Sequence, residues 1–451
     1  MFRKILVANR GEIAVRIIRA ARGLGVPTVA VFSTADREAL HVRMADERVC
    51  IGPPSVEESY LNIPAIIGAA LTLRADAIHP GYGFLSENGD FAEACQSSGI
   101  TFIGPRVRAI RLMGDKPRAR KMMARAEIPV LSGSVGAMNN AEEAKKVARD
   151  VGYPVLLKAA AGGGGRGLRI AKSDAELVRV FQVAQAEGGA SFGNSQVYVE
   201  KYLERARHIE FQIVADQHKQ VIHLGERDCS IQRRYQKLLE ETPSPALDPP
   251  LRAQMGRIAV RAAQVVGYNN VGTIEFLLAP DRAFYFIEMN TRVQVEHPVT
   301  EMTTGIDIVQ ESIRAAAGEP LSIAQDAVQP RGHAVECRIN AEDPDTQLPS
   351  PGTVTAFLPP GGFGIRVDTH LQVGCTIPIY YDSLVAKVVA HGRDRADSVQ
   401  RMRGALAECT IEGIKTNIPL HQRILQHPQF RAGNTHTRFL EELAEPVGAT
   451  A

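Results

Sequence analysis

The chain has 451 residues, 45% of them apolar, so it is too long for one hydrophobic core and too apolar to be disordered throughout; two to four domains are expected. Its 52 Lys and Arg residues balance 50 Asp and Glu residues, which excludes a protein that holds nucleic acid by bulk positive charge. Six scattered cysteines without a CxxC pair argue against a structural zinc site and a disulfide framework.

The N-terminal apolar run of four residues is too short for a signal peptide. No segment approaches the roughly 18 apolar residues that a membrane-spanning helix needs. A cytoplasmic protein that contacts neither membrane nor nucleic acid is therefore predicted.

Residues 1–103 have the pattern of an α/β domain. A short apolar strand at 4–8, an amphipathic helix at 11–25 and a second strand at 27–32 predict a βαβ unit and a parallel sheet. The first turn offers Gly11 alone where a dinucleotide-binding fold would carry GxGxxG, so that function is not favoured. Residues 75–88 read as a strand that enters a loop containing Gly81 and Gly83.

Two segments follow this domain. Residues 104–130 are basic and helical in pattern, and they predict linker helices that end near Pro129. Residues 131–203 read as a compact subdomain: a helix at 140–152, strands at 154–160 and 168–171, a helix at 174–188 and a strand at 197–203. From residue 204 to 451 the pattern is mixed α/β.

The tract AGGGGRG at 161–167 places four successive glycines between two strands. Glycine backbone can approach a ligand closely and direct several N–H groups at phosphate oxygens, although glycine content alone equally fits a flexible hairpin tip. Lys158, on the preceding strand, favours a phosphate-binding lid. The tract is not a P-loop, because no GK[ST] follows and the next element is a strand.

Strands 273–279 and 283–290 form a predicted hairpin. A two-residue loop at Asp281–Arg282 would place Glu275 directly opposite Glu288. Like charges there destabilise a sheet unless a divalent cation lies between them, although two solvated glutamates would be the simpler interpretation. Asn290 adds a third oxygen ligand on the same side, so a magnesium site is predicted.

After Asn290 the polar alternation continues through Arg292, Gln294 and Glu296. A straight strand from Glu288 to Glu296 would span about 26 Å, which is too far for one reacting centre, so the chain must bend after Asn290. Arg292 could then bind an oxyanion and Glu296 could act as a general base. His297-Pro298 is expected to be a turn without chemistry.

The basic run at 226–241 contains Arg227, Arg233, Arg234 and Lys237. By itself such a run indicates a solvated strand face. Gln232 and Lys237 acquire a functional interpretation only from the resemblance that follows.

The motifs of the chain, taken in order, resemble those of the biotin carboxylases of the ATP-grasp superfamily. The resemblance runs from residue 2 to about 440 and rests on ANRGEIAVRIIRA, HPGYGFLSEN, RLMGDK, GGGGRG, ERDCSIQRRYQK, FIEMNTRVQVEHPVTE and RGHAVECRINAEDP. It implies an α/β fold (α+β overall) of the ATP-grasp type, with an N-terminal parallel-sheet domain, a mobile glycine-loop lid and a mixed C-terminal domain.

The resemblance also implies a role for each matching residue, sorted by ligand. The residues implied for ATP are Lys116, Lys158, Gly164, Gly165, Glu200, Lys201, Tyr202, Leu203, His208, Gln232, Tyr235, Glu275 and Glu288. Those implied for the metal ion are Glu275, Glu288 and Asn290; for bicarbonate, Lys237, Arg292, Gln294, Val295 and Arg338; and for biotin, Tyr82, Gly83 and Arg338. The implied catalytic groups are Lys237, Arg292, Glu296 and Arg338.

The implied reaction uses ATP, Mg²⁺ (or Mn²⁺) and biotin carried on a partner protein. Glu296 deprotonates bicarbonate, which attacks the γ-phosphate of ATP, and the carboxyphosphate formed yields CO₂ and phosphate. Phosphate removes the N1 proton of biotin, and the enolate, stabilised by Arg338, captures CO₂. A closed lid would keep water from hydrolysing carboxyphosphate.

No MKM biotinylation motif occurs, so a stand-alone subunit is expected. Its implied partners are a biotin carboxyl carrier protein, carboxyltransferase subunits and a second copy in a homodimer. The expected final acceptor is acetyl-CoA, in fatty acid synthesis, with propionyl-CoA, another acyl-CoA or pyruvate as alternatives. A different ATP-grasp ligase, disfavoured by Arg338, and an inactive scaffold, disfavoured by the retained charged residues, are the competing functions.

Two positions depart from the family pattern. Tyr235 stands where many members have His, so a contact that needs imidazolium would be lost and altered nucleotide affinity is expected. Leu168, where Met is common, is an apolar exchange without an expected effect.

Overall fold

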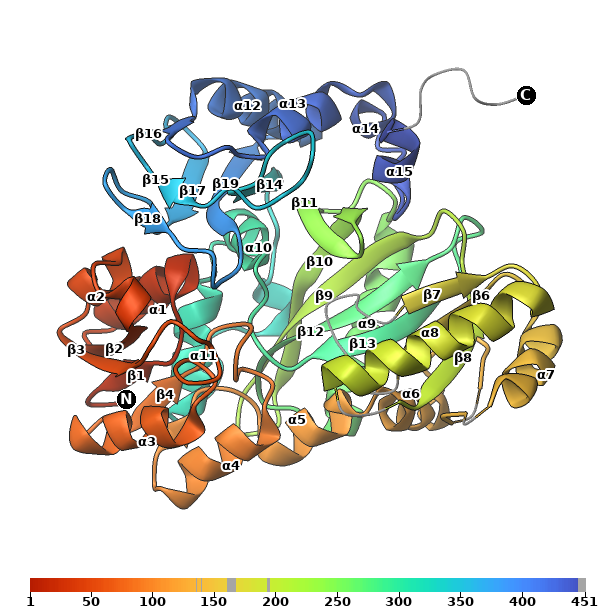
Figure 1. The fold of residues 1–451 in the computed structure, drawn as a ribbon, viewed down its shortest axis with the longest axis horizontal. Coiled ribbons are helices and arrows are strands. Elements are labelled where there is room, and N and C mark those ends of the chain that lie inside the picture. The colour runs from red at the N-terminus through yellow and green to blue at the C-terminus, as the bar shows by residue number, and fades with distance from the viewer. Residues whose placement is uncertain (135, 139, 160–167, 193–194, 445–451) are drawn as a thin grey trace.

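A parallel sheet forms the N-terminal part of the computed structural model, which describes residues 1–134, 136–138, 140–159, 168–192 and 195–444 (Figure 1). The strand order is β3-β2-β1-β4-β5, and β1 pairs in parallel with β2 and β4, as the predicted βαβ unit requires. The strands are β1 Ile5–Val7, β2 Thr28–Ser33, β3 Glu47–Gly52, β4 Ala77–His79 and β5 Thr101–Phe102. The accompanying helices are α1 Gly11–Gly23, η1 Thr34–Asp36, α2 Leu40–Met44, α3 Ile63–Thr72 and α4 Gly89–Ser97.

Two helices then lead to a small subdomain with its own core. Helices α5 Val107–Gly114 and α6 Lys116–Arg125 occupy the predicted linker, and the three-stranded sheet has the order β7-β6-β8. Its elements are α7 Ala141–Val151, β6 Val155–Ala159, β7 Leu168–Ala171, α8 Asp174–Phe192 and β8 Val197–Lys201. Leu157, Phe181 and Val197 lie at the centre of this core. The glycine tract predicted to form a lid, 161–167, lies outside the described residues.

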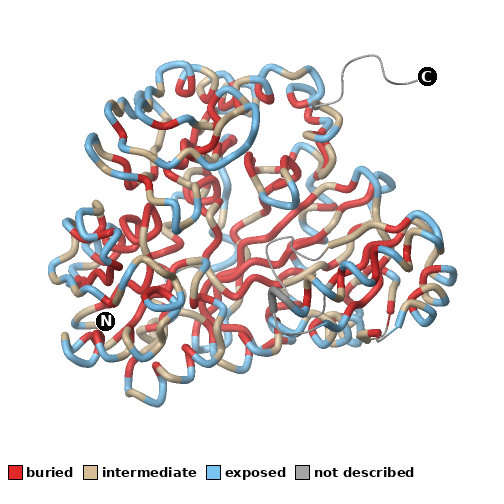
Figure 2. Tube along the Cα trace, viewed as in Figure 1, coloured by how far each residue is buried: buried red, intermediate tan, exposed pale blue. Residues whose placement is uncertain are grey.

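An eight-stranded sheet occupies the centre of the molecule, in the order β13-β12-β9-β10-β11-β14-β19-β17 (Figure 1). Its strands are β9 Arg207–Ala215, β10 Val221–Arg233, β11 Gln236–Thr242, β12 Asn270–Leu278, β13 Phe284–Asn290, β14 His333–Asn340, β17 Ile365–Thr369 and β19 Leu384–Gly392. The alternating apolar residues of these strands are buried, and Figure 2 shows the sheet as the most continuously buried part of the chain. The pairing of β11 with β14 joins residues 204–290 to the C-terminal part in one sheet.

Helices and short strands surround this sheet. The helices are α9 Pro249–Val266, α10 His297–Thr304, α11 Ile308–Ala316, η2 Gln325–Ala327, α12 Arg395–Glu408, α13 Ile418–Gln426, α14 Pro428–Arg431 and α15 Phe439–Ala444. The short strands are β15 Gly352–Thr353, β16 Ala356–Leu358, β18 Thr376–Ile377 and β20 Thr410–Glu412. Among the described residues, no helix has the length and apolar character needed to cross a membrane.

The N-terminal domain packs directly on the chain that follows β13. One hydrophobic core contains Ile13 and Ile17 of α1 together with Val293, Ile308 and Ile313. The two residues of α1 are more than 270 positions away from the other three in the sequence. Their packing brings loop 80–88 beside residues 291–296. The predicted site is therefore assembled from distant segments rather than from one motif.

The β12–β13 hairpin confirms the predicted pairing of Glu275 with Glu288, but the predicted two-residue loop is wrong. Leu278 pairs with Phe284, and the loop has an extra residue, with Arg282 in the left-handed region at φ 72°. The register shifts by one between Glu275 and Phe276. This β-bulge restores the pairing that the shorter loop would have produced, which is why the predicted carboxylate pair is correct.

Candidate functional site

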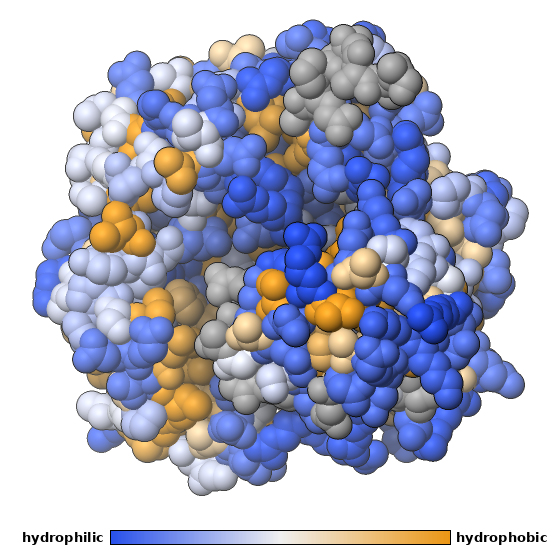
Figure 3. All heavy atoms as spheres, turned by 45° about the vertical axis from the view of Figure 1, so that its right-hand side comes forward, coloured by the Kyte–Doolittle hydropathy of each residue, from blue (hydrophilic) through white to orange (hydrophobic). Residues whose placement is uncertain are grey.

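A cavity of about 1170 Å³ opens between the N-terminal domain, the small subdomain and the part that contains the eight-stranded sheet. Figure 3 shows a face that is hollowed near its centre and surrounded largely by hydrophilic side chains. The cavity is lined by most of the predicted residues: Tyr82, Gly83, Lys116, Lys158, Lys201, Tyr202, Leu203, His208, Gln232, Tyr235, Lys237, Glu275, Glu288, Asn290, Arg292, Gln294, Val295, Glu296 and Arg338. Residues separated by more than 250 positions thus share one cavity.

Three predicted residues are not among those lining the cavity. Glu200 is buried behind it, with its carboxylate 2.6 Å from Nζ of Lys158 and 3.5 Å from Nε of Arg120. Gly164 and Gly165 lie outside the described residues. Glu200 can therefore act on a ligand through its backbone or by orienting Lys158.

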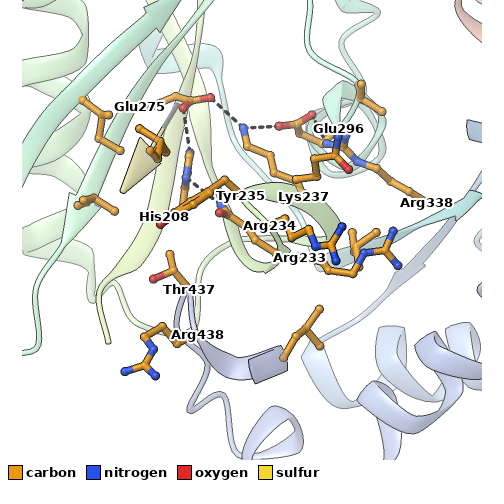
Figure 4. A pocket seen from close by; sticks show the side chains of 18 of the residues that line it. His208, Arg233, Arg234, Tyr235, Lys237, Glu275, Glu296, Arg338, Thr437 and Arg438 are labelled. Atoms are coloured by element: carbon orange, nitrogen blue, oxygen red, sulfur yellow. Dashed lines mark hydrogen bonds and ion pairs between the residues drawn. The ribbon is translucent and has the colours of Figure 1, made fainter. Parts of the chain in front are cut away.

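Lys237, on β11, is the central cation of the cavity (Figure 4). Its Nζ lies 2.5 Å from Glu210, 2.8 Å from Glu275 and 2.7 Å from Glu296. Burial by itself would lower the pKa of Lys237, but the three carboxylates outweigh it and raise that pKa well above its usual value. Lys237 therefore stays charged and draws together carboxylates from three strands or loops.

A tight turn carries Lys237 into the cavity. Gln232 pairs with Lys237 and Arg233 with Gln236, so Arg234 and Tyr235 form a two-residue loop. Both loop residues have positive φ, 51° and 65°, a conformation that usually selects Gly or Asn. Non-glycine residues in this conformation are strained, and such strain is often kept where a turn must deliver functional side chains.

The expectation of a solvated face for residues 226–241 is wrong for Arg227. Its side chain is fully buried, and its Nε lies 2.5 Å from Oε1 of Glu210. Its positive charge by itself predicted a side chain exposed to solvent, but the carboxylate of Glu210 lies on the neighbouring strand β9, directly opposite Arg227 in the ladder. Such pairing is what allows a buried arginine.

Arg338, on β14, connects two buried glutamates. Its guanidinium contacts Glu240 at 2.5 Å and Glu296 at 2.8 Å. The same two carboxylates, together with Glu336, raise the pKa of Arg338 although burial lowers it. Glu240 was not predicted, because its role comes from a cross-sheet contact with a residue 98 positions away.

We predict that Glu240 makes stability depend on pH. Burial and the charge of Glu296 raise the pKa of Glu240 to about 7, against the lowering effect of Arg338 and Lys237. Because the folded protein favours the protonated acid, this contribution is complete below about pH 4.5 and is lost as pH rises through about 7. The free energy of unfolding of wild type relative to Glu240→Gln should fall by about 2–3 kcal/mol from pH 4.5 to pH 8. Urea unfolding across that range measures it, and a constant difference would refute it.

Arg292 is held by groups on both sides of the cavity. Its Nε lies 2.9 Å from Glu87, and its Nη1 donates to Oε1 of Gln294 at 2.7 Å. Burial lowers the pKa of Arg292, but Glu87, Glu296 and Glu275 together raise it on balance, so the guanidinium remains charged. Glu87, which also accepts from the Thr291 backbone at 2.8 Å, was not predicted. The one feature of the sequence that could have indicated a role for Glu87 is its position in the same loop as Gly81 and Gly83.

The residues predicted to hold a metal ion form an oxygen-rich corner. Glu275 accepts from the Asn290 amide at 2.8 Å and lies 3.1 Å from Nε2 of His208, while Glu288 lies 2.6 Å from Nζ of Lys116. Two carboxylates that oppose each other in a ladder and face a cavity are suitable ligands for Mg²⁺. Each is compensated by a different ammonium group, Lys237 for Glu275 and Lys116 for Glu288.

The chain bends after β13, as the distance estimate required. His297, expected in a turn, is the first residue of α10, and Pro298 occupies the first helical turn, where proline is favoured. His297 is fully buried, and burial holds its pKa well below its usual value. It is therefore neutral, and the bend brings Glu296 back toward Lys237.

Comparison with known proteins gives one consistent likeness. Residues 1–110 match the family model of the biotin carboxylase N-terminal domain, 115–324 the carbamoyl-phosphate synthase L chain ATP-binding domain, and 336–442 the biotin carboxylase C-terminal domain. A biotin carboxylase from Nostoc sp. is 59% identical over 98% of this chain and 99% of its own length.

Two solved structures have the same architecture. The Campylobacter jejuni biotin carboxylase, in complex with an ATP compound, has a TM-score of 0.96 and 47% identity over 98% of this chain and 99% of its own. The biotin carboxylase domain dimer of Hydrogenobacter thermophilus 2-oxoglutarate carboxylase, with MgADP, ADP and bicarbonate, has a TM-score of 0.96 and 51% identity over 98% of each chain.

Proposed function

The chain belongs to the biotin carboxylase family of ATP-grasp ligases, and we propose that it carboxylates biotin with separate groups of cavity residues for bicarbonate, nucleotide and biotin. It is an ATP-dependent ligase that uses ATP, a divalent cation, bicarbonate and biotin. The observation that carries the proposal is the position of Lys237. Its ammonium lies within 2.8 Å of both Glu275, on the nucleotide side, and Glu296, on the bicarbonate side.

On the bicarbonate side, Glu296 is the proposed general base. Arg292, Lys237, Gln294 and the Val295 backbone would bind the anion around it, and Arg292 is prepared for this by its contact with Glu87. A charged guanidinium and an ammonium together favour a small oxyanion in this corner. Bicarbonate bound there gives its proton to Glu296, and its oxygen is then placed to attack the γ-phosphate of ATP.

On the nucleotide side, Lys116 and Lys158 are the proposed contacts of the phosphates. Residues 200–203 would meet the adenine, with His208 and Gln232 close by; the amide of Gln232 donates to Nδ1 of His208 at 3.0 Å. We include Gly164 and Gly165 as lid residues from the family resemblance alone. The proposed metal ligands are Glu275, Glu288 and Asn290, and Mg²⁺ bound there would neutralise charge on the phosphates.

On the biotin side, Tyr82, Gly83 and Arg338 are the proposed contacts. The contacts of Arg338 with Glu240 and Glu296 orient its guanidinium. Arg338 would bind the enolate oxygen of biotin in place of one of these carboxylates, and its positive charge would stabilise the anion that captures CO₂.

Three further assignments are ours. We propose that the acceptor is biotin on a separate carrier protein, that carboxyltransferase subunits pass the group to acetyl-CoA, and that the protein acts as a homodimer. The likeness to a 2-oxoglutarate carboxylase domain keeps another final acceptor as the alternative. The six free cysteines support a reducing, cytoplasmic location.

Release of phosphate from ATP tests the proposed function. Turnover should require bicarbonate and Mg²⁺ and should rise when free biotin is added. ATP turnover that does not respond to biotin would refute the proposal and favour a different ATP-grasp ligase.

We predict that Tyr235→His lowers the KM for ATP severalfold and leaves kcat within twofold of wild type. Tyr235 lines the cavity and is 41% exposed, so a histidine can be placed there without disturbing the core. Imidazolium adds a charge-assisted contact near the nucleotide, so the decrease should be larger at pH 6 than at pH 8. Steady-state kinetics at both pH values measure it, and an unchanged KM at pH 6 would contradict it.

A further inference from the structure

Lys387, on β19, is a fully buried lysine that none of the roles above uses. Its Nζ donates to the carbonyl oxygen of Val295 at 2.9 Å and lies 3.1 Å from Oε2 of Glu12. Asp368 is farther away, at 4.0 Å. Lys387 pairs directly with Arg338 across the β14–β19 ladder. Its side chain therefore lies next to that of the proposed catalytic Arg338, on the same face of the sheet.

Glu12, in the first turn of α1, connects this lysine to the other side of the cavity. Its Oε1 accepts a hydrogen bond from the hydroxyl of Tyr82. Burial raises the pKa of Glu12, while Lys387 and Tyr82 act in the opposite direction. The neighbouring Asn9 holds the same loop, because its amide donates to the carbonyls of Pro80 at 2.7 Å and Tyr82 at 2.8 Å.

A continuous chain of contacts thus runs from the half-buried Tyr82 through the buried Glu12 and Lys387 to the Val295 carbonyl. Its first member faces the proposed biotin position, and its last belongs to the peptide that leads into Glu296. The participants come from loop 80–83, α1, β19 and the bend after β13, so local sequence holds none of them together. A buried lysine and a buried carboxylate without a positioning role would be an expensive arrangement, since an apolar pair of similar volume is often as stable.

We propose that Glu12 and Lys387 are positioning residues that orient the Val295–Glu296 peptide toward bicarbonate and couple it to Tyr82 on the biotin side. The inference rests on the proposed function, because it assigns these residues to the same bicarbonate and biotin positions. Lys387 fixes the plane of the 295–296 peptide, and Glu12 transmits the position of Tyr82 to it.

The test is a set of three variants measured for ATP turnover with each substrate varied in turn. Lys387→Met should raise the KM for bicarbonate at least tenfold and leave the KM for ATP within twofold. Glu12→Gln still accepts from Tyr82 but loses the ion pair, so it should raise the KM for both bicarbonate and biotin. Lys4→Met, which breaks the Lys4–Glu47 pair outside the cavity, is the matched control and should change none of them.

The double variant Glu12→Gln/Lys387→Met removes both buried charges together, and it covers the case in which Lys387→Met alone fails to fold. Thermal unfolding and the same kinetics are recorded for it. A folded double variant with KM values for bicarbonate and biotin within twofold of wild type would overturn the inference alone. If Lys387→Met, Glu12→Gln and the double variant all fail to fold, the inference is also overturned, because the role of the two residues would then be structural. A wild-type protein without biotin-dependent turnover would overturn the proposed function as well.

Discussion

Replacement of Glu296 by Gln is expected to lower bicarbonate- and biotin-dependent ATP turnover by two to four orders of magnitude. Glutamine keeps the size of the side chain and its hydrogen-bonding oxygen, but it cannot accept a proton. Glu296 is fully buried, and although burial favours its neutral form, Lys237 and Arg338 hold its pKa well below the usual value. The side chain is therefore ionised before substrate binds, as a base must be.

The same contacts explain how a carboxylate with a depressed pKa can act as a base. Lys237 is proposed to bind bicarbonate and Arg338 the biotin enolate, so part of their interaction with Glu296 should be lost when these substrates bind. Its pKa then rises toward that of an ordinary buried glutamate, which strengthens it as a base. The KM for ATP should stay within threefold of wild type in Glu296→Gln, because the nucleotide residues are not altered.

Glu311→Gln is the matched control for this variant. Glu311 is a largely buried glutamate on α11 that accepts from Ser322 at 3.2 Å, away from the cavity. It should retain wild-type turnover. Wild-type rates in Glu296→Gln would refute the assignment of the base, and equal losses in both variants would indicate damage to the fold.

Replacement of Lys237 by Met is expected to remove catalysis and to destabilise the folded protein. Three carboxylates, those of Glu210, Glu275 and Glu296, lose a cation within 2.8 Å. Removing one partner of a buried ion pair typically costs about 3–5 kcal/mol, because the remaining charge is uncompensated. Turnover should fall at least a hundredfold, since bicarbonate loses an ammonium that binds it and Glu296 loses its orientation.

Two measurements separate these effects. Urea unfolding gives the loss of stability, and turnover at saturating ATP, below the unfolding transition, gives the loss of catalysis. High Mg²⁺ should recover part of the stability, because a cation bound at Glu275 compensates one of the carboxylates. Turnover of Lys237→Met within tenfold of wild type would contradict the central role of this lysine.

Lys415→Met is the corresponding control. Lys415 is 67% exposed in its side chain and pairs with Asp343 at 2.5 Å on the surface. Exposed ion pairs are screened by water and contribute little to stability, so neither stability nor turnover should change measurably. The contrast compares a buried lysine that has three carboxylate partners with an exposed lysine that has one.

Much of the fold followed from periodicity along the chain. The βαβ pattern predicted the parallel pairing of β1 with β2, and alternation in residues 273–290 predicted the hairpin that opposes Glu275 and Glu288. These features depend on neighbours within about twenty residues, where backbone hydrogen bonding and turn geometry decide the register. The bend after Asn290 was predicted by distance, but its continuation as helix α10 at His297 was not.

The amino-acid sequence by itself determined which residues can carry this chemistry: the carboxylate pair on β12 and β13, the arginine and glutamate that follow, and the motifs of the family. Only the tertiary structure decided which charges meet. Lys237 reaches Glu296 across 59 positions, and Lys387 reaches the Val295 carbonyl across 92. The ionisation of each group depends on burial and on partners brought by other strands, and a one-dimensional pattern contains neither. That is why Arg227 looked solvated, and why Glu12, Glu240 and Lys387 emerged only once the sheets were packed together.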